Sequence, residues 1–103
     1  MPDLDEAGMV VGVGWVDLLI PESHSLKDKR KVVRSVVDRL RARFNAAVAE
    51  VGDQELWGRA RIGFSVVSND SRLVNSVLDQ IRDAIDNMAI AIVANSEIEI
   101  LHL

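Results

Sequence analysis

The chain has 103 residues, no cysteine and a net charge of −4, so we expect one domain without disulfides or thiol chemistry. Its 49% hydrophobic and 27% charged residues are typical of a soluble globular protein, and no apolar run reaches the roughly 20 residues that span a bilayer. Residues 1–8 (MPDLDEAG) lack the apolar run of a signal peptide. We therefore expect a disordered acidic extension over 1–8, a single domain over 9–103, a cytoplasmic location and no membrane partner.

Residues 9–20 (MVVGVGWVDLLI) are predicted to form the first strand, because they are rich in Val, Leu and Ile. Both alternating sets of side chains are apolar, which is typical of a strand that is covered on both faces. Gly12 and Gly14 share one face, and we expect a neighbouring chain or side chain to approach closely there. The candidate interface residues on the other face are Val11, Val13 and Trp15.

Residues 25–44 are predicted to form an amphipathic helix. Ser25 is a good N-cap, and Asp28 follows three residues later, close to the capping-box pattern. Apolar residues recur at helical spacing and form one stripe. The stripe consists of Leu26, Val33, Val37, Leu40 and Phe44, widened by Val32 and Val36.

Positive charge is concentrated in this helix, although the whole chain is acidic. Residues 27–43 hold eight of the twelve Lys and Arg residues and two acidic residues, which gives this segment +6 against −10 for the remainder. A flank of cations can track the phosphates of RNA, or it can be a solvated face whose long stems cover the edge of the core. The candidate nucleic-acid-binding residues are Lys27, Arg30, Lys31, Arg34 and Arg41 on one flank, whereas Lys29, Arg39 and Arg43 are placed on the other flank or beyond it.

Two further strands are predicted over residues 46–51 (AAVAEV) and 60–68 (ARIGFSVVS). Asn69-Asp70 then supplies caps for a second helix, whose apolar positions keep helical spacing to about residue 87. Residues 89–103 predict one interrupted strand or two short ones, with a bulge or bend at Asn95-Ser96.

This order of elements predicts an α+β, ferredoxin-like βαββαβ fold, with a four-stranded antiparallel sheet and two helices on one face. The opposite face of the sheet would be bare in a monomer, although the first strand is apolar on both sides. We therefore expect a homo-oligomer, with a dimer favoured, in which another copy covers that face.

Several short motifs occur in an order that points to a known family. They are HSLKDKR (24–30), RFN (43–45), VAEV (48–51), DQELW (53–57) and VSND (67–70). On these motifs the chain resembles, over about residues 9–103, the YlxP-like family of bacterial proteins (domain of unknown function 503). The resemblance implies a ferredoxin-like fold and brings no established activity. It also implies a link to RNA or ribosomes, since the family's genes often lie among genes for translation factors and ribosome maturation.

Neither histidine lies in a pattern that indicates catalysis or metal binding. His24 has no second histidine at helical spacing and no cysteine nearby, so we expect it to support the start of the helix. His102 is likewise expected to be structural. Acylphosphatases share this small fold, but the PESHS loop (21–25) lacks their glycine-rich cradle and their arginine. We therefore expect no enzyme, no cofactor and no metal.

Two other residues have open alternatives. Asp17 stands in an apolar strand, where it would lie at an exposed edge or pair with Arg59 or Arg61. Trp57 is expected to pin its loop onto the core, and the alternative is an anchor for a partner.

The leading hypothesis is a non-enzymatic module that binds RNA or a ribosomal particle through the basic flank. The alternative is a homo-oligomeric protein-interaction module that uses the open sheet face. A small-anion enzyme at the start of the first helix is a distant third.

Overall fold

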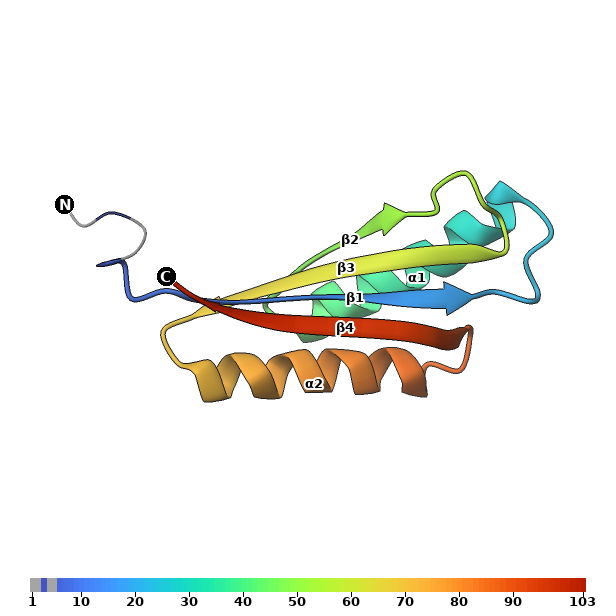
Figure 1. Cartoon of the computed structure of the whole chain (residues 1–103). Helices are drawn as coiled ribbons and strands as arrows, with labels where there is room; N and C mark the ends of the chain where they lie inside the picture. The colour runs from blue at the N-terminus through green and yellow to red at the C-terminus, as the bar shows by residue number, and fades with distance from the viewer. Residues whose placement is uncertain (1–2, 4–5) are drawn as a thin grey trace.

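The computed structural model describes residue 3 and residues 6–103, which form a four-stranded antiparallel sheet and two helices (Figure 1). The strand order across the sheet is β2-β3-β1-β4. This is the predicted ferredoxin-like βαββαβ arrangement, so the predicted fold class is confirmed. The elements are β1 (Val10–Leu19), α1 (Leu26–Arg43), β2 (Ala47–Gly52), β3 (Arg59–Ser68), α2 (Ser71–Asn87) and β4 (Ile92–His102).

The last strand is a single strand with one irregularity. The pairing of β1 with β4 passes from Asp17 opposite Asn95 to Leu18 opposite Val93, so Ala94 is the extra residue of a bulge. The predicted irregularity at Asn95-Ser96 thus lies one residue too late. The disorder predicted for residues 1–8 falls in part on residues 1–2 and 4–5, which lie outside the described residues.

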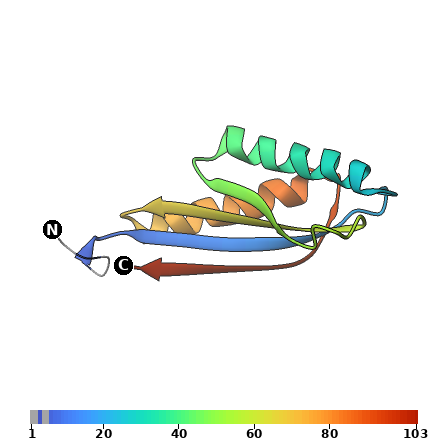
Figure 2. The same ribbon diagram turned by 90° about the horizontal axis from the view of Figure 1, so that it is seen from above.

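Both helices cover one face of the sheet, and the other face is open (Figure 2). On the covered face, α2 packs almost directly against the backbone of β1. A Cβ atom at Gly12 would lie 2.4 Å from Cγ1 of Val74 and 2.7 Å from Cδ1 of Leu78. The close approach predicted at this glycine is therefore made by the chain's own second helix.

The helix starts follow from short polar side chains. The Ser25 hydroxyl accepts a hydrogen bond from the Asp28 amide at 3.1 Å, and the Asp28 carboxylate accepts one from the His24 amide at 3.1 Å. The first bond is the predicted N-cap, and the second resembles the return bond of a capping box but comes from the amide of the residue before the cap. Asp70 caps α2 by accepting from the amide of Arg72 at 2.9 Å. Of the helices that the structure describes, neither is long and apolar enough to cross a membrane.

Candidate functional site

Four of the five predicted RNA-binding cations lie together on the outer surface of α1. Their spacing of three and four residues brings them onto neighbouring turns of one helix face. All four are exposed, and with Ser35 and Asp38 they line a shallow hollow of about 500 Å³. We call this surface the basic face; its residues are Lys27, Arg30, Lys31 and Arg34.

The basic face carries charge that is not neutralised locally. The ion pairs found among residue 3 and residues 6–103 join other residues, namely Lys29 with Glu50, Arg59 with Asp53, Arg61 with Asp17 and Arg82 with Asp79. Asp38 stands four residues after Arg34, a spacing that often supports an ion pair, yet no such pair forms. The four cations thus remain available to an external anion.

Arg41, the fifth predicted cation, is engaged in the fold. Its Nη2 donates a hydrogen bond to the carbonyl oxygen of Val48 at 2.7 Å. Val48 belongs to β2, an edge strand of the sheet, so this bond ties the last turn of α1 to that edge. Arg39 and Arg43 lie on another side of the helix, where they line a separate hollow with Leu40, Ala84, Asn87 and Met88.

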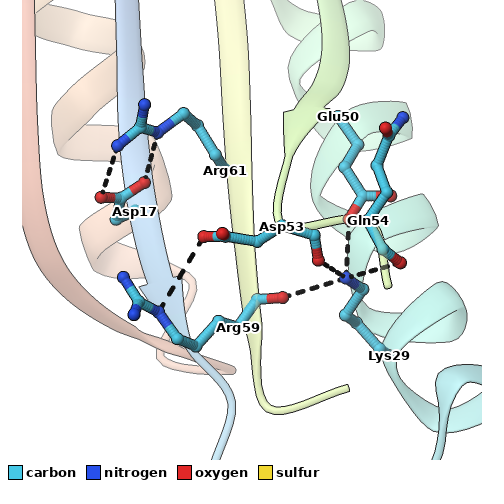
Figure 3. Close-up of polar contacts among 7 residues, drawn as sticks. All are labelled: Asp17, Lys29, Glu50, Asp53, Gln54, Arg59 and Arg61. Atoms are coloured by element: carbon cyan, nitrogen blue, oxygen red, sulfur yellow. Dashed lines mark hydrogen bonds and ion pairs between the residues drawn. The ribbon is translucent and has the colours of Figure 1, made fainter. Parts of the chain in front are cut away.

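Lys29, predicted on the other flank of the helix or beyond it, is instead buried. Its side chain is 1% exposed and reaches the connection between β2 and β3 (Figure 3). Nζ donates hydrogen bonds to the carbonyl oxygens of Gln54 at 3.2 Å, Arg59 at 3.0 Å and Asp53. The Glu50 carboxylate lies 3.0 Å from the same nitrogen. The burial of Lys29 could have been predicted from its position, because residues 29, 33, 36 and 40 follow the helical spacing of the buried side chains.

The site around Lys29 is structural. An ammonium group has three N–H donors, and the three carbonyl oxygens use all of them, while the Glu50 carboxylate balances the charge as an ion pair. Nothing remains on this amine for a substrate. The contacts instead fix the loop of residues 53–58 against the first turn of α1.

Trp57 and His24 lie close together at the end of the molecule where this loop meets the start of α1. Their ring centroids are 6.4 Å apart and their planes are inclined by 52°. Trp57 is 49% exposed, so the expectation that it pins the loop onto the core is wrong. Lys29 performs that role, and the adjacent Leu56 is also exposed.

The centre of the open sheet face holds a polar cluster over Trp15. Arg61 donates two hydrogen bonds to the Asp17 carboxylate, at 2.7 and 3.0 Å, which confirms one of the two predicted partners (Figure 3). This guanidinium holds the pKa of Asp17 below its usual range, although burial of the carboxylate opposes the shift. The same guanidinium lies 4.0 Å from the centroid of the Trp15 ring. Trp15 is therefore partly covered by the chain itself.

One end of the open face remains apolar. Val11 is half-buried and is paired with Val67 on one side and with Leu101 on the other. Val67 is 62% exposed and Leu101 is 39% exposed. Val13, two residues further along β1 on the same face, is paired with Ser65 of β3 and with Glu99 of β4. The predicted interface residues thus share one face, but only its Val11 end is free of charged neighbours in these pairings.

The described residues contain no group of three His, Asp or Glu side chains placed to hold a metal ion. The His24 backbone amide donates a hydrogen bond to the Asp28 carboxylate, and the His24 ring faces Trp57. Within the described part of the chain, the His24 ring has no hydrogen bond to a carboxylate or to a second histidine.

The fold and this surface define a small α+β protein whose positive charge is gathered on one helix. Residues 11–98 match the family model described as "Protein of unknown function (DUF503)", and the chain belongs to this family. The chain is 28% identical over 78 residues to the Uncharacterized protein YlxP of Bacillus subtilis (strain 168), a match that covers 76% of this chain and 85% of that protein. The resemblance seen in the motifs is thereby confirmed.

Two solved structures have similar folds. The de novo designed protein Foldit4 has a TM-score of 0.52 and 13% identity, over 92% of this chain and 96% of that one. A hydantoinase/carbamoylase family amidase from Burkholderia ambifaria also has a TM-score of 0.52, with 11% identity, over 93% of this chain and 28% of that one. At these identities the likeness shows the fold alone.

Proposed function

We propose that this protein is a non-enzymatic module that binds RNA, free or within a ribosomal particle, through the basic face of α1. The observation that carries the proposal is the set of four exposed, unpaired cations on consecutive turns. RNA presents a regular row of phosphates, and each phosphate that a cation neutralises releases counterions and adds affinity.

The distribution of charge over the fold also favours an approach of RNA to the basic face. The basic face lies on α1, which packs beside β2, whereas β4 at the opposite edge of the sheet carries Glu97 and Glu99 (Figure 1). The exposed side of α2 adds Asp83 and Asp86. A polyanion is attracted to one side of such a molecule and repelled from the other, so it approaches in one orientation.

If the basic face were only a solvated helix surface, we would expect its cations to pair with neighbouring acidic residues. In a purely solvated helix, opposite charges at a spacing of four residues commonly pair and stabilise the helix slightly. The Arg34 and Asp38 side chains have this spacing and stay unpaired, while the stems of the cations shape the hollow. An accessible row of cations suits an external phosphate better than it suits internal pairing.

The test compares two charge reversals on the same helix. Binding of a fluorescein-labelled RNA is measured by anisotropy for the wild type, for Lys31→Glu/Arg34→Glu and for the control Arg39→Glu/Arg43→Glu. We expect the first variant to bind at least about tenfold more weakly, because two phosphate contacts become repulsive. The control changes net charge equally and should keep most of the affinity. Equal losses in both variants, or no salt-sensitive binding by the wild type, would refute the proposal.

A second candidate function is self-assembly through the open sheet face, and the apolar end around Val11, Val67 and Leu101 favours it. The occupant that we propose is a second copy of the chain. A twofold axis parallel to the strands places β4 of each copy over the β2–β3 side of the other. Glu97 and Glu99 would then lie over the side that carries Arg59 and Arg61, whose ion pairs with Asp53 and Asp17 are within one copy.

This assembly is tested by molecular mass in solution. The wild type should be a dimer by light scattering, and Val67→Asp should be a monomer, because it buries a charge in the interface. Leu73→Asp is a matched control, since Leu73 is an apolar residue on α2 that is 52% exposed, against 62% for Val67. A monomeric wild type would remove the self-assembly proposal and leave the RNA proposal untouched.

A further inference from the structure

We infer that Trp57, supported by His24, stacks on an unpaired base of the RNA that the basic face holds. The inference rests on the proposed function and specifies its ligand as a single strand or a loop. The sequence alone favours recognition of phosphate and shape, because no aromatic residue alternates with the cations of 27–43. The fold changes this expectation, because it brings a distant aromatic residue to the start of the same helix.

The geometry of the two rings suits an open stacking site. A centroid separation of 6.4 Å at 52° is within the range of interacting, tilted aromatic pairs. In this arrangement His24 buttresses the indole without covering it, and about half of the Trp57 surface still reaches solvent, at 49%. A nucleobase can then contact the indole face, and such stacking tolerates any base.

The loop that carries Trp57 is held in place before any ligand arrives. Lys29 binds its first two carbonyl groups, those of Asp53 and Gln54. The Leu56 amide donates to the Asp53 carbonyl at 3.0 Å, and the Gly58 carbonyl accepts from the Ile20 amide at 2.9 Å. Because these bonds fix both ends of the loop, stacking on Trp57 loses little conformational entropy.

The aromatic pair lies at the end of α1 where the basic face begins. His24 stands three residues before Lys27, the first cation of that face, and the loop of Trp57 lies at the same end of α1 (Figure 1). The surrounding loops carry Glu22 and Glu55, which repel phosphate. This end therefore suits a base, while the cations further along suit the sugar–phosphate backbone.

The test combines two changes: the bases are removed from the RNA probe, and the indole ring of Trp57 is removed from the protein. One probe is a fluorescein-labelled ten-nucleotide uridine RNA, and the other is an oligonucleotide of the same length with the central bases replaced by abasic sites. Both keep the same phosphates. Binding of each probe is measured for the wild type, Trp57→Ala, Trp57→Phe and the control Leu56→Ala, which truncates an exposed neighbour that has no ring.

For the wild type, we expect the abasic probe to bind about 5- to 100-fold more weakly than the uridine probe. For Trp57→Ala the two probes should bind equally, because the ring that reads the base is gone. Trp57→Phe should restore most of the difference, and Leu56→Ala should keep it. The salt dependence of binding should be the same in all of these variants, since their phosphate contacts are intact.

Two results would overturn the inference, and they are distinguishable. If the wild type binds both probes equally and with strong salt dependence, base stacking is refuted while the proposed function stands; an anchor for a protein partner would give this result. If the wild type binds neither probe, and also fails to bind RNA of greater length, both the inference and the proposed function fail.

Discussion

The ammonium of Lys29 lies 3.0 Å from the carboxylate of Glu50, inside the protein, where Lys29 is only 1% exposed. The same ammonium binds three backbone carbonyl groups of the segment that follows β2. One charged side chain therefore joins the first turn of α1, the end of β2 and the beginning of β3. The loop that presents Trp57 depends on this junction.

Replacing Lys29 by Met should destabilise the protein by about 3–5 kcal/mol, because it removes one member of a buried ion pair and leaves carbonyl groups unsatisfied. The measurement is the free energy of unfolding from urea denaturation. Lys27→Met is the control, since Lys27 is exposed two residues earlier and its change should stay within about 0.5 kcal/mol. A loss below about 1 kcal/mol for Lys29→Met would contradict this account of the junction.

The Asp17–Arg61 pair predicts an acid-sensitive part of the stability. The pKa of Asp17 is lowered in the folded state, chiefly by its hydrogen bonds to Arg61. The contribution is therefore present at neutral pH, above the pKa of the unfolded carboxyl group, and is lost as the pH falls through the lower folded pKa. We expect Asp17→Asn to be less stable than the wild type at pH 7, with a difference that shrinks below about pH 4. Urea midpoints at several pH values check this, and a difference independent of pH would contradict it.

Gly12 is needed because α2 packs against the backbone of β1. An added methyl group would lie 2.4 Å from Val74 and 2.7 Å from Leu78, so Gly12→Ala should destabilise the protein by about 1–3 kcal/mol. A Cβ atom at Gly58 would meet nothing within 4 Å, so Gly58→Ala is the control. Thermal unfolding of both variants tests the packing, and equal midpoints would show that α2 can move away at little cost.

The N-cap of α1 also sets the position of His24. Ser25→Ala removes the acceptor for the Asp28 amide and should reduce stability by about 1 kcal/mol, whereas Ser25→Gly should lose only a few tenths. Ser35→Ala, in the middle of the same helix, serves as the control. Chemical denaturation distinguishes these effects, and an unchanged Ser25→Ala variant would show that the hydroxyl is not the effective cap.

The sequence predicted the order and type of the elements because local patterns determine them. The two-sided apolar strand, the stripe from Leu26 to Phe44 and the caps at Ser25 and Asp70 each depend on residues that are close in the chain. The fold class then follows from the order of these elements.

The parts that escaped prediction depend on contacts between distant residues. Lys29 is buried because Asp53, Gln54 and Arg59 supply carbonyl groups from a segment more than twenty positions away. The same holds for Arg41, which binds an exposed edge of β2, and for Trp57, which meets His24. From the sequence alone, a charged side chain is expected to be solvated. Only the fold shows which cations bind groups of the protein itself.

The most direct test of the central claim is the slope of log affinity against log salt concentration for single-stranded RNA. Four phosphate contacts by the basic face predict a slope of about −3 for the wild type. Lys31→Glu/Arg34→Glu should bring the slope to about −1.5 or flatter, while Arg39→Glu/Arg43→Glu should leave it near −3. A wild-type slope near zero, or a slope that both variants reduce equally, would contradict RNA binding by the basic face of α1.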